Sequence, residues 1–424
     1  MLSTRGEPPF SSAVTVDLRQ DWLTANDSFS WHVRLPGATG AIEAAKLFAS
    51  VPLKGNPPGA GHLSGSLVVQ AGLGAVGGEC WETLARSGVA ALVGVDPDDY
   101  GDESVLTQPI FWRHRGQHKA RVQGDKARRI NPAARVCTAV GYAEDLPLWL
   151  LRAATVLVVA GDSEDLLLWA ARVGAALAKP VVQGAVHGET GTAIVRGFAF
   201  TDQTAACPRC VWGQPRQPAS AASCDPSAAR SRGGPATRTL PAITALAGQL
   251  LGSESLKWCT GAASLALRGE ECTYSLWTHR SLRTQLPRRE GCSFAHERWV
   301  LCDLPRPHHE MTIEMLIEHV SGSWPAVPPW VRAEVPWFAS AVCGKCGAAA
   351  PVRRFARLGA PVGVCSCGAG LLADRQSMHE VVPRADLCAV RDRSLAQLGL
   401  GPDRAIGVLD GEQWAYFFPH MAAV

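Results

Sequence analysis

A glycine-rich turn between a buried strand and a helix is the feature that most constrains the fold of this chain. Leu67–Gln70 is a short apolar run, typical of a buried parallel strand, and it leads into Gly72-Leu-Gly74-Ala-Val-Gly77. A helical stretch and a second apolar run, Ala90–Val95, follow. This is a βαβ unit whose glycines let the backbone approach a phosphate at a helix N-terminus. The pattern predicts a nucleotide-binding α/β domain and leaves NAD and ATP equally open.

Strands and helices continue to alternate after this unit, so the sequence predicts a doubly wound sheet with helices on both faces. Asp96 ends the second strand, 19 residues beyond Gly77, where an acid can bind ribose hydroxyls. Further strands are expected at 136–140, 155–160, 180–183 and 192–200, the last of them antiparallel, and helices at 117–130, 164–178 and 239–260.

Composition and charge exclude several classes of protein. Of the 424 residues, 47% are apolar and 19% are charged, which is ordinary for two or three globular domains. The 41 basic and 38 acidic side chains nearly cancel, so neither a nucleic acid nor a membrane surface is an expected partner. No apolar run approaches the ~20 residues of a membrane span. Fourteen cysteines without a secretory signal indicate metal binding and a cytoplasmic location.

The sequence divides into three predicted parts. Residues 1–64 are rich in Pro and Gly and are interpreted as an N-terminal extension or small subdomain. Residues 65–300 hold the α/β domain, including a Pro-, Ser-, Ala- and Arg-rich loop over 207–235. Residues 301–424 change in style, with Trp- and Pro-rich linker material before a module framed by cysteines. This last part is predicted to be a smaller C-terminal domain.

A series of short motifs distinguishes between the two nucleotides. In chain order they are Asp96-Pro-Asp98, Ser104-Val-Leu-Thr107-Gln108, Gly116-Gln-His-Lys119 and Asn131-Pro132. With the glycine turn, they resemble the ThiF/MoeB/HesA superfamily, which includes the ubiquitin-activating enzymes. That family's pattern is GxGxxG, acid-x-acid, Asn-Leu-x-Arg-Gln, Gly-x-x-Lys and Asn-Pro. The resemblance covers roughly residues 67–296 and implies a Rossmann-like adenylation domain that uses ATP and magnesium.

The resemblance implies a role for each matching residue. Lys119 would neutralise the nucleotide phosphates and the charge that develops at the α-phosphate. Asp162 follows a predicted strand, where the family keeps its magnesium ligand, and ligands collect at the carboxyl ends of strands in such sheets. The other positions expected to bind the nucleotide are Gly72, Gly74, Gly77, Asp96, Asp98 and Gln108.

Two positions depart from the family's Asn-Leu-x-Arg-Gln stretch. Ser104 and Thr107 stand where the family has an asparagine and a phosphate-contacting arginine, and only Gln108 is kept. Arg113 or Arg115 is a candidate to compensate for the missing arginine. Without compensation, the domain is instead a catalytically weak scaffold that pairs with an active partner.

A first zinc site is predicted at the end of the α/β domain. Cys207-Pro-Arg-Cys210 can present two thiolates to one tetrahedral ion. The resemblance implies a second pair far downstream, where this chain has Cys292-Ser-Phe-Ala-His296. Three sulfurs and one nitrogen would complete the site. The alternative is four side chains without a metal.

A second zinc site is predicted in the C-terminal module. Cys343-Gly-Lys-Cys346 and Cys365-Ser-Cys367 are separated by 18 residues, and glycines flank each pair. Glycine near the sulfurs lets the backbone turn sharply around an ion. Four cysteines in such turns are typical of a structural zinc ribbon, in which the metal supplies folding energy to a module with little core.

An acceptor thiol is expected between the two halves of the first zinc site. The family places its acceptor cysteine in a crossover loop, before a helix that ends in a Glu-x-x-Lys-like stretch. Here Glu254–Lys257 matches that stretch, and Cys224 lies in the loop with Arg230 and Arg232 nearby. The resemblance therefore implies that Cys224 receives an activated C-terminal glycine. An incidental loop cysteine is the alternative.

The implied activity is ATP-dependent adenylation of the C-terminus of a ubiquitin-like protein, followed by thioester formation at Cys224. The C-terminal domain suggests transfer to an acceptor similar to a conjugating enzyme, and a homodimer is expected because family members usually pair. The alternatives are activation of a sulfur-carrier protein, adenylation of a peptide, or the scaffold role. A nicotinamide oxidoreductase would leave Lys119 and the cysteine motifs unexplained.

Overall fold

The computed structural model describes residues 15–17, 63–201, 205–212, 239–292, 294, 296–401, 404–411 and 413–419. Cys224, Arg230 and Arg232 therefore lie outside the described residues. The chain divides into two compact units. The first unit consists of Met1–Asp145 and Ala153–His296, and the second of Leu146–Arg152 and Glu297–Val424.

The first unit is built on a nine-stranded sheet with the order β1-β4-β3-β2-β5-β6-β7-β8-β9. Neighbours from β1 to β6 pair in parallel, whereas β6, β7, β8 and β9 are antiparallel. The central strands are buried along their whole length, as expected for a parallel sheet covered on both faces. The strands are β1 (Thr15–Asp17), β2 (Leu67–Ala71), β3 (Ala91–Asp96), β4 (Arg135–Val140), β5 (Val156–Val159), β6 (Pro180–His187), β7 (Thr192–Ala199), β8 (Glu270–Ser275) and β9 (Ser281–Gln285).

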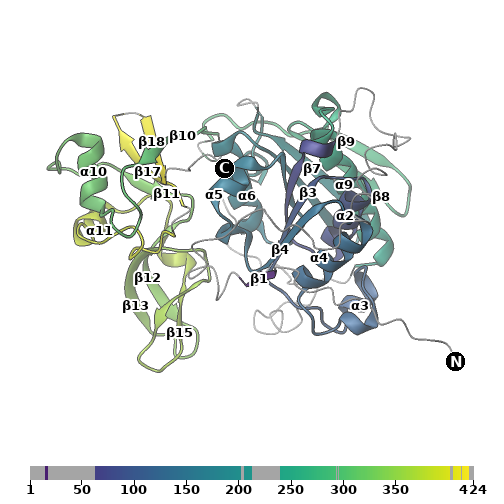
Figure 1. Ribbon diagram of the computed structural model, residues 1–424, viewed down its shortest axis with the longest axis horizontal. Helices are drawn as coiled ribbons and strands as arrows, with labels where there is room; N and C mark the ends of the chain where they lie inside the picture. The colour runs from purple at the N-terminus through teal and green to yellow at the C-terminus, as the bar shows by residue number, and fades with distance from the viewer. Residues whose placement is uncertain are drawn as a thin grey trace. The chain divides into compact units, whose positions relative to one another are not determined.

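The longest helix of this region, α9, lies side by side with α2, the helix that follows the glycine turn (Figure 1). Their backbones approach closely because Gly248 and Gly252 of α9 face α2. Both helices contribute to the main core, with Trp81 and Leu251 among its fully buried side chains. The helices of the first unit are α2 (Ala75–Arg86), α3 (Ser104–Thr107), α4 (Lys119–Ile130), α6 (Glu164–Leu177), α7 (Pro208–Trp212) and α9 (Pro241–Cys259), with 3-10 turns at Leu63–Gly65, Trp112–His114, Ala143–Asp145 and Ala263–Leu265. Helix α5 (Leu148–Ala153) falls almost wholly within the second unit.

The second unit has two small sheets with separate cores. A four-stranded sheet, β10-β18-β17-β11, carries one core with α10 and α11, and β13-β12-β15-β14, with β16 on β12, carries the other. Helix α10 begins at a Thr312 cap and ends at Gly322 in the left-handed region, as its sequence favours. The elements are β10 (Val300–Leu304), α10 (Ile313–Ser321), β11 (Val331–Ala333), β12 (Trp337–Cys343), β13 (Ala349–Phe355), β14 (Pro361–Val364), β15 (Gly370–Ala373), a 3-10 turn (Arg375–Ser377), β16 (Met378–His379), α11 (Arg384–Ala389), β17 (Ile406–Asp410) and β18 (Gln413–Pro419).

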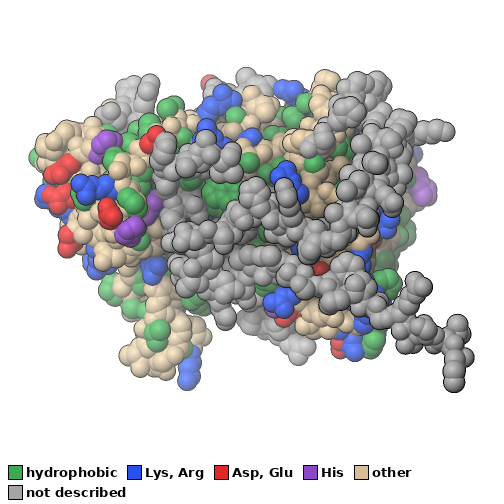
Figure 2. All heavy atoms as spheres, viewed as in Figure 1, with side chains coloured by type: hydrophobic (Ala, Val, Ile, Leu, Met, Phe, Trp, Pro, Cys, Tyr) green, Lys and Arg blue, Asp and Glu red, His purple; other side chains and the backbone are tan. Residues whose placement is uncertain are grey.

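The predicted fold class is confirmed: an α/β domain with a Rossmann-like parallel sheet and a smaller module framed by cysteines. The sequence under-predicted the antiparallel end of the sheet. The strand expected at 180–183 continues to His187, and β8 and β9 form a hairpin that adds two antiparallel strands beyond those expected. In the part of the chain that is described, no helix is long and apolar enough to cross a membrane. Positive and negative side chains are mixed on the face drawn in Figure 2.

Candidate functional site

The glycine turn packs so closely against neighbouring backbone that side chains do not fit. Gly72 has a φ of +90°, and a Cβ there would lie 2.7 Å from backbone atoms of Ala160 and Gly161, at the end of β5. A Cβ at Gly77 would lie 2.1 Å from the carbonyl oxygen of Gly72. The turn therefore holds the end of β2, the end of β5 and the start of α2 against one another. This is the arrangement that brings backbone N–H groups to a phosphate.

Two polar side chains lie over the third position of this turn. A Cβ placed on Gly74 would be 3.3 Å from Oε1 of Gln108 and 3.9 Å from Nζ of Lys119. Gly74 is also the N-cap of α2, and no side chain caps the helix there. The structure thus brings together the glycines, Gln108 and Lys119, residues that are up to 47 positions apart in the sequence. The ammonium group of Lys119 beside an uncapped helix N-terminus forms an environment that favours an anion.

Lys119 is buried, and carboxylates keep it charged. Its Nζ lies 2.9 Å from Oδ2 of Asp98. Burial by itself lowers the pKa of Lys119, but the carboxylates of Asp96 and Asp98 reverse that effect and raise the pKa above its ordinary value. The pKa of Asp96 is raised in turn by burial, and Lys119 opposes that rise. A protonated ammonium group is consequently held beside the turn at neutral pH.

Asp96 also holds the turn in place directly. Its Oδ2 accepts a hydrogen bond from the backbone N–H of Leu73 at 2.7 Å, and its Oδ1 accepts one from the N–H of Asp98 at 2.9 Å. Tyr100, which is fully buried, donates its hydroxyl to the carbonyl of Leu73 at 3.3 Å and accepts a bond from Gln123 at 2.8 Å. The acid at the end of β3 is therefore part of the framework of the turn.

The two departures from the family pattern have local roles of their own. Ser104 Oγ accepts hydrogen bonds from the N–H of Gly101 at 3.1 Å and from Nε2 of Gln108 at 3.2 Å, so it orients that glutamine. The carbonyl of Thr107 accepts a bond from the hydroxyl of Thr244 in α9 at 3.3 Å. These contacts link the segment beside the turn to the helix that follows the predicted crossover loop.

The candidate compensating arginines are engaged on the surface. The guanidinium of Arg113 lies 4.8 Å from the ring centre of Phe111, and that of Arg115 lies 3.5 Å from the ring centre of Trp112. Arg115 also pairs with Asp102 at 2.7 Å. In this arrangement the cationic charge beside Gly74 comes from Lys119.

Asp162 lies on the loop between β5 and α6. It is exposed and directly follows Gly161, whose backbone packs against Gly72. The cap of α6 is the next residue, Ser163, whose hydroxyl accepts a bond from the N–H of Leu166 at 3.4 Å. Because a neighbour supplies the cap, that task does not account for the aspartate. A carboxylate at this edge of the sheet suits a hydrated magnesium ion.

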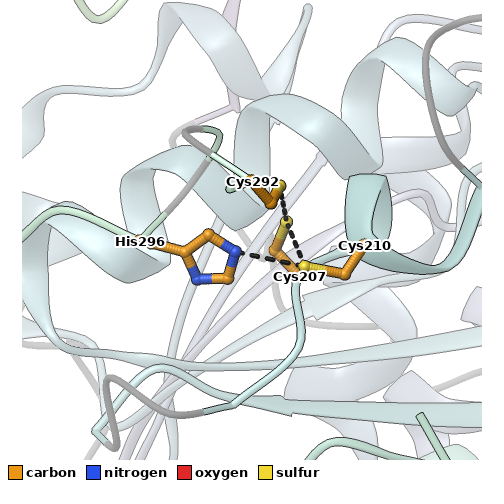
Figure 3. A group of neighbouring side chains, drawn as sticks. All are labelled: Cys207, Cys210, Cys292 and His296. Atoms are coloured by element: carbon orange, nitrogen blue, oxygen red, sulfur yellow. Dashed lines mark hydrogen bonds between the residues drawn. The ribbon is translucent and has the colours of Figure 1, made fainter. Parts of the chain in front are cut away.

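The first cysteine cluster converges from two distant segments, as Figure 3 shows. Sγ of Cys207 lies 3.7 Å from Sγ of Cys210 and 3.8 Å from Sγ of Cys292, and Sγ of Cys210 lies 3.2 Å from Nε2 of His296. All four ligand atoms lie within 4.8 Å of one another. A tetrahedral zinc ion with bonds of ~2.3 Å to sulfur sets its sulfurs ~3.8 Å apart. Burial lowers the pKa of His296, which favours the neutral imidazole that binds zinc, so the donor set fits this metal.

The second cluster joins two tight turns at the ends of β12 and β14. Sγ of Cys343 lies 3.5 Å from Sγ of Cys367, and Sγ of Cys346 lies 3.6 Å from Sγ of Cys365. Hydrogen bonds from the N–H groups of Cys346 and Lys345 lower the pKa of Cys343 to about 6, which favours the thiolate that zinc requires. The glycine after each pair, Gly347 and Gly368, has a positive φ. Four such sulfurs fit one tetrahedral zinc ion.

Of the residues predicted around the crossover loop, the structure describes Glu254 and Lys257 of the helix that follows it. Cys224, the expected acceptor, lies outside the described residues. Glu254 and Lys257, near the end of α9, form an ion pair of 2.5 Å, and Glu254 also accepts a bond from the N–H of Leu267. The ion pair lies within α9, and the bond from Leu267 fastens the end of α9 to the segment before β8. The ion pair explains the Glu-x-x-Lys spacing structurally.

Comparison with known proteins identifies the family. The model of the ThiF family matches residues 53–294, more than half of the chain. The chain therefore belongs to the ThiF family of adenylyltransferases. A comparison with curated proteins gave no match.

Similar solved structures share part of the fold. Escherichia coli MccB with ATP is 18% identical, with a TM-score of 0.44, covering 55% of this chain and 67% of that chain. The microcin C7 biosynthetic enzyme MccB with N-formylated MccA is 18% identical, with a TM-score of 0.45, covering 55% and 68%. PaaA is 18% identical, with a TM-score of 0.40, covering 62% and 78%.

Proposed function

We propose that this protein uses ATP to adenylate the C-terminal carboxylate of a ubiquitin-like protein. Membership of the ThiF family supports adenylation. The observation that carries the proposal is Lys119, a buried lysine kept protonated by Asp96 and Asp98 beside the uncapped start of α2. A fixed cation next to free helix N–H groups is suited to a nucleotide phosphate and to the negative charge that grows during phosphoryl chemistry.

The first step is attack of a carboxylate oxygen of the carrier on the α-phosphorus of ATP. A bond forms between the carboxylate oxygen and the α-phosphorus. The bond between the α-phosphorus and the oxygen that bridges it to the β-phosphorus breaks, and pyrophosphate leaves with that oxygen. Lys119 neutralises charge on the phosphates, Gly72, Gly74 and Gln108 line the phosphate side, and Asp96 or Asp98 contacts the ribose. Magnesium, which Asp162 would hold, supplies further neutralisation of the phosphates.

The second step transfers the acyl group to sulfur. The thiolate of Cys224 attacks the acyl carbon, the bond to the phosphate oxygen breaks, and AMP leaves with that oxygen. The thioester is then passed to an acceptor similar to a conjugating enzyme. In this proposal the two cysteine clusters hold structural zinc and take no part in the chemistry.

The second unit favours a ubiquitin-like protein over a sulfur carrier or a free peptide. The family match ends at residue 294, whereas the second unit adds the stretch from Glu297 onward, with two cores and its own cysteine cluster. A simple carrier adenylation does not require such an addition, so we assign the second unit to binding the protein that receives the acyl group. The working form is proposed to be a homodimer, which light scattering of the purified protein tests.

The direct test is ATP–pyrophosphate exchange with candidate carriers. We expect Lys119→Met and Asp162→Asn to reduce exchange at least a hundredfold, since the first removes the cation beside the phosphates and the second removes the carboxylate that would hold magnesium. Lys126→Met is the matched control, because Lys126 is another ion-paired lysine of α4 and its partner is Glu82. Cys224→Ala should keep exchange and lose the thioester, detected as a thiol-sensitive adduct on a gel.

Two outcomes would contradict the proposal. The first is a lack of exchange by folded wild-type protein with ubiquitin-like, sulfur-carrier and peptide substrates, which would favour a scaffold role. The second is a Lys119→Met variant as active as the Lys126→Met control. If only a peptide supports exchange, adenylation is confirmed, but the substrate is a peptide and not a ubiquitin-like protein.

A further inference from the structure

A buried amide interrupts the otherwise apolar strand β2. Gln70 has an exposed fraction of 0%, and its neighbours Val68, Val69 and Ala71 are also buried. Burying a primary amide is unfavourable unless its donors and acceptor are paired. Its Oε1 is buried and has no hydrogen-bond partner among the residues that the structure describes. A polar residue kept here at such a cost indicates a local task, and its donor side shows what that task is.

Both hydrogen bonds that the Gln70 side chain donates end on carbonyl groups of the glycine turn, Gly72 to Gly77. Nε2 donates to the carbonyl of Gly72 at 3.0 Å and to the carbonyl of Gly77 at 2.7 Å. One carbonyl lies at the start of the turn and the other in the first turn of α2. A single side chain thus joins the end of the strand to the beginning of the helix. The opposite orientation of the amide would place Oε1 against two carbonyl oxygens, so the surroundings fix its orientation.

The next carbonyls of the turn are also bound within the domain. Leu73 O accepts the Tyr100 hydroxyl at 3.3 Å, and Gly74 O accepts the N–H of Gly78 at 2.8 Å. Carbonyl oxygens repel phosphate oxygens, whereas N–H groups attract them. A turn whose carbonyls are tied down offers its N–H groups without having to rearrange when an anion arrives. The N–H groups of the turn are thus preorganised electrostatically for an anion.

We propose that Gln70 is a positioning residue for nucleotide binding. By holding the carbonyls of Gly72 and Gly77, it keeps the N–H groups at the start of α2 directed at the phosphates of ATP. The inference rests on the proposed function for the identity of the nucleotide, but not for the identity of the carrier. We expect its effect to be on nucleotide affinity, since both of the described side-chain hydrogen bonds of Gln70 end on the glycine turn and neither involves Lys119.

The expected result is a selective loss of ATP affinity. Gln70→Leu and Gln70→Met remove both hydrogen bonds while keeping the site apolar and of similar volume. Each should raise the Kd and the KM for ATP about tenfold, as the loss of one or two hydrogen bonds implies, and leave the KM for the carrier unchanged. Gln70→Glu keeps the shape but cannot donate when ionised, so it should weaken ATP binding at least as much.

The experiment measures ATP binding by calorimetry without any carrier, and ATP–pyrophosphate exchange with one. Thr138→Val is the matched control, because Thr138 is fully buried in β4 of the same sheet and its hydroxyl has no partner within the described residues. The control should bind ATP as the wild type does. A general loosening of the sheet would instead weaken ATP binding in the control and the Gln70 variants alike.

The outcomes separate this inference from the proposed function. If the wild type binds ATP but exchanges with no carrier, the proposed function fails, and the binding comparison still tests Gln70. Folded Gln70→Leu and Gln70→Met variants with wild-type affinity for ATP would overturn the inference. Failure of all three variants to fold would assign Gln70 to stability and overturn it as well.

Discussion

His308, in the second unit, is buried, whereas its sequence, His308-His309, by itself favours a solvated turn. It has an exposed fraction of 2%, and its Nε2 lies 2.9 Å from the carbonyl of Arg404, so this nitrogen carries the proton. Burial lowers the pKa of His308 to about 4, with His309 adding to the effect and the bond to Arg404 opposing it. The folded protein therefore keeps this ring neutral at pH values where an unfolded chain would protonate it.

This histidine should make the protein less stable in mild acid. The folded pKa lies below the unfolded value of ~6.5, so the stability that depends on the neutral ring is present above pH 6.5 and is lost as the pH falls toward 4. Between pH 7 and pH 5, wild type should lose about 2 kcal/mol more unfolding free energy than His308→Gln. Urea unfolding at both pH values measures the difference, and equal losses would contradict the assignment.

The ion pair beside the glycine turn illustrates how the charge and the role of a residue depend on its tertiary surroundings. Lys119 was identified from its spacing after a glycine, but only the fold shows that Asp98 lies 2.9 Å away and that the ammonium is buried. A surface lysine in the same sequence position would have no such constraint. The charge of Lys119 is therefore set by the neighbouring carboxylates and not by its own ordinary pKa.

At the scale of elements, the contact between α2 and α9 is the closest helix packing beside the site. A Cβ on Gly248 would lie 2.4 Å from Cβ of Glu79 and 2.7 Å from the carbonyl of Val76. A Cβ on Gly252 would lie 2.9 Å from the methyl group of Thr83. Helix α2 starts at the glycine turn, and α9 follows the predicted crossover loop. The contact between the two helices therefore holds the glycine turn in a set position relative to α9.

Gly248→Ala should destabilise the protein despite favouring the helix. Alanine gains about 1 kcal/mol of helix propensity over glycine, but the clash is with the backbone and the Cβ of α2, which cannot move aside cheaply. A net loss of about 1–2 kcal/mol is expected from overpacking. Gly65→Ala is the control, since a Cβ there meets nothing within 4 Å. Chemical denaturation compares the two, and a stabilised Gly248→Ala would show that the helices separate freely.

At the scale of the whole molecule, two units carry one cysteine cluster each. The first cluster closes the first unit by joining α7 to Cys292 and His296, and the second joins the turns of the small sheet around β12. The small sheet has a limited core of its own, including Phe338 and Leu371. Such a module is expected to depend on a bound metal more than the large sheet would.

Purified protein should therefore contain two zinc ions per chain. Cys207→Ser and Cys346→Ser should each reduce the content to one, because each removes a ligand from a different cluster. Cys388→Ser, at an exposed cysteine of α11 outside both clusters, should leave two. Mass spectrometry of the native protein counts the ions. A value of two in both cluster variants would show that the four-residue sets are not the ligands.

The candidate site was partly predictable because several of its residues belong to motifs with short, regular spacing. Glycines, an acid-x-acid strand end and CxxC pairs each encode a turn or ligand geometry over a few residues. Gln70 and Tyr100 were missed because their importance depends on partners that only the fold brings near. The usable signal was a glutamine inside an apolar strand.

The sequence by itself determined the α/β class, the phosphate turn and the grouping of cysteines into pairs, since these follow from periodicity and from short-range backbone geometry. Only the tertiary structure decided that Asp98 holds Lys119 and that Thr107 is tied to α9 through Thr244. Contacts between residues far apart in the chain depend on how whole elements pack. No spacing rule within one segment specifies them, because the partner's position is set by the rest of the core.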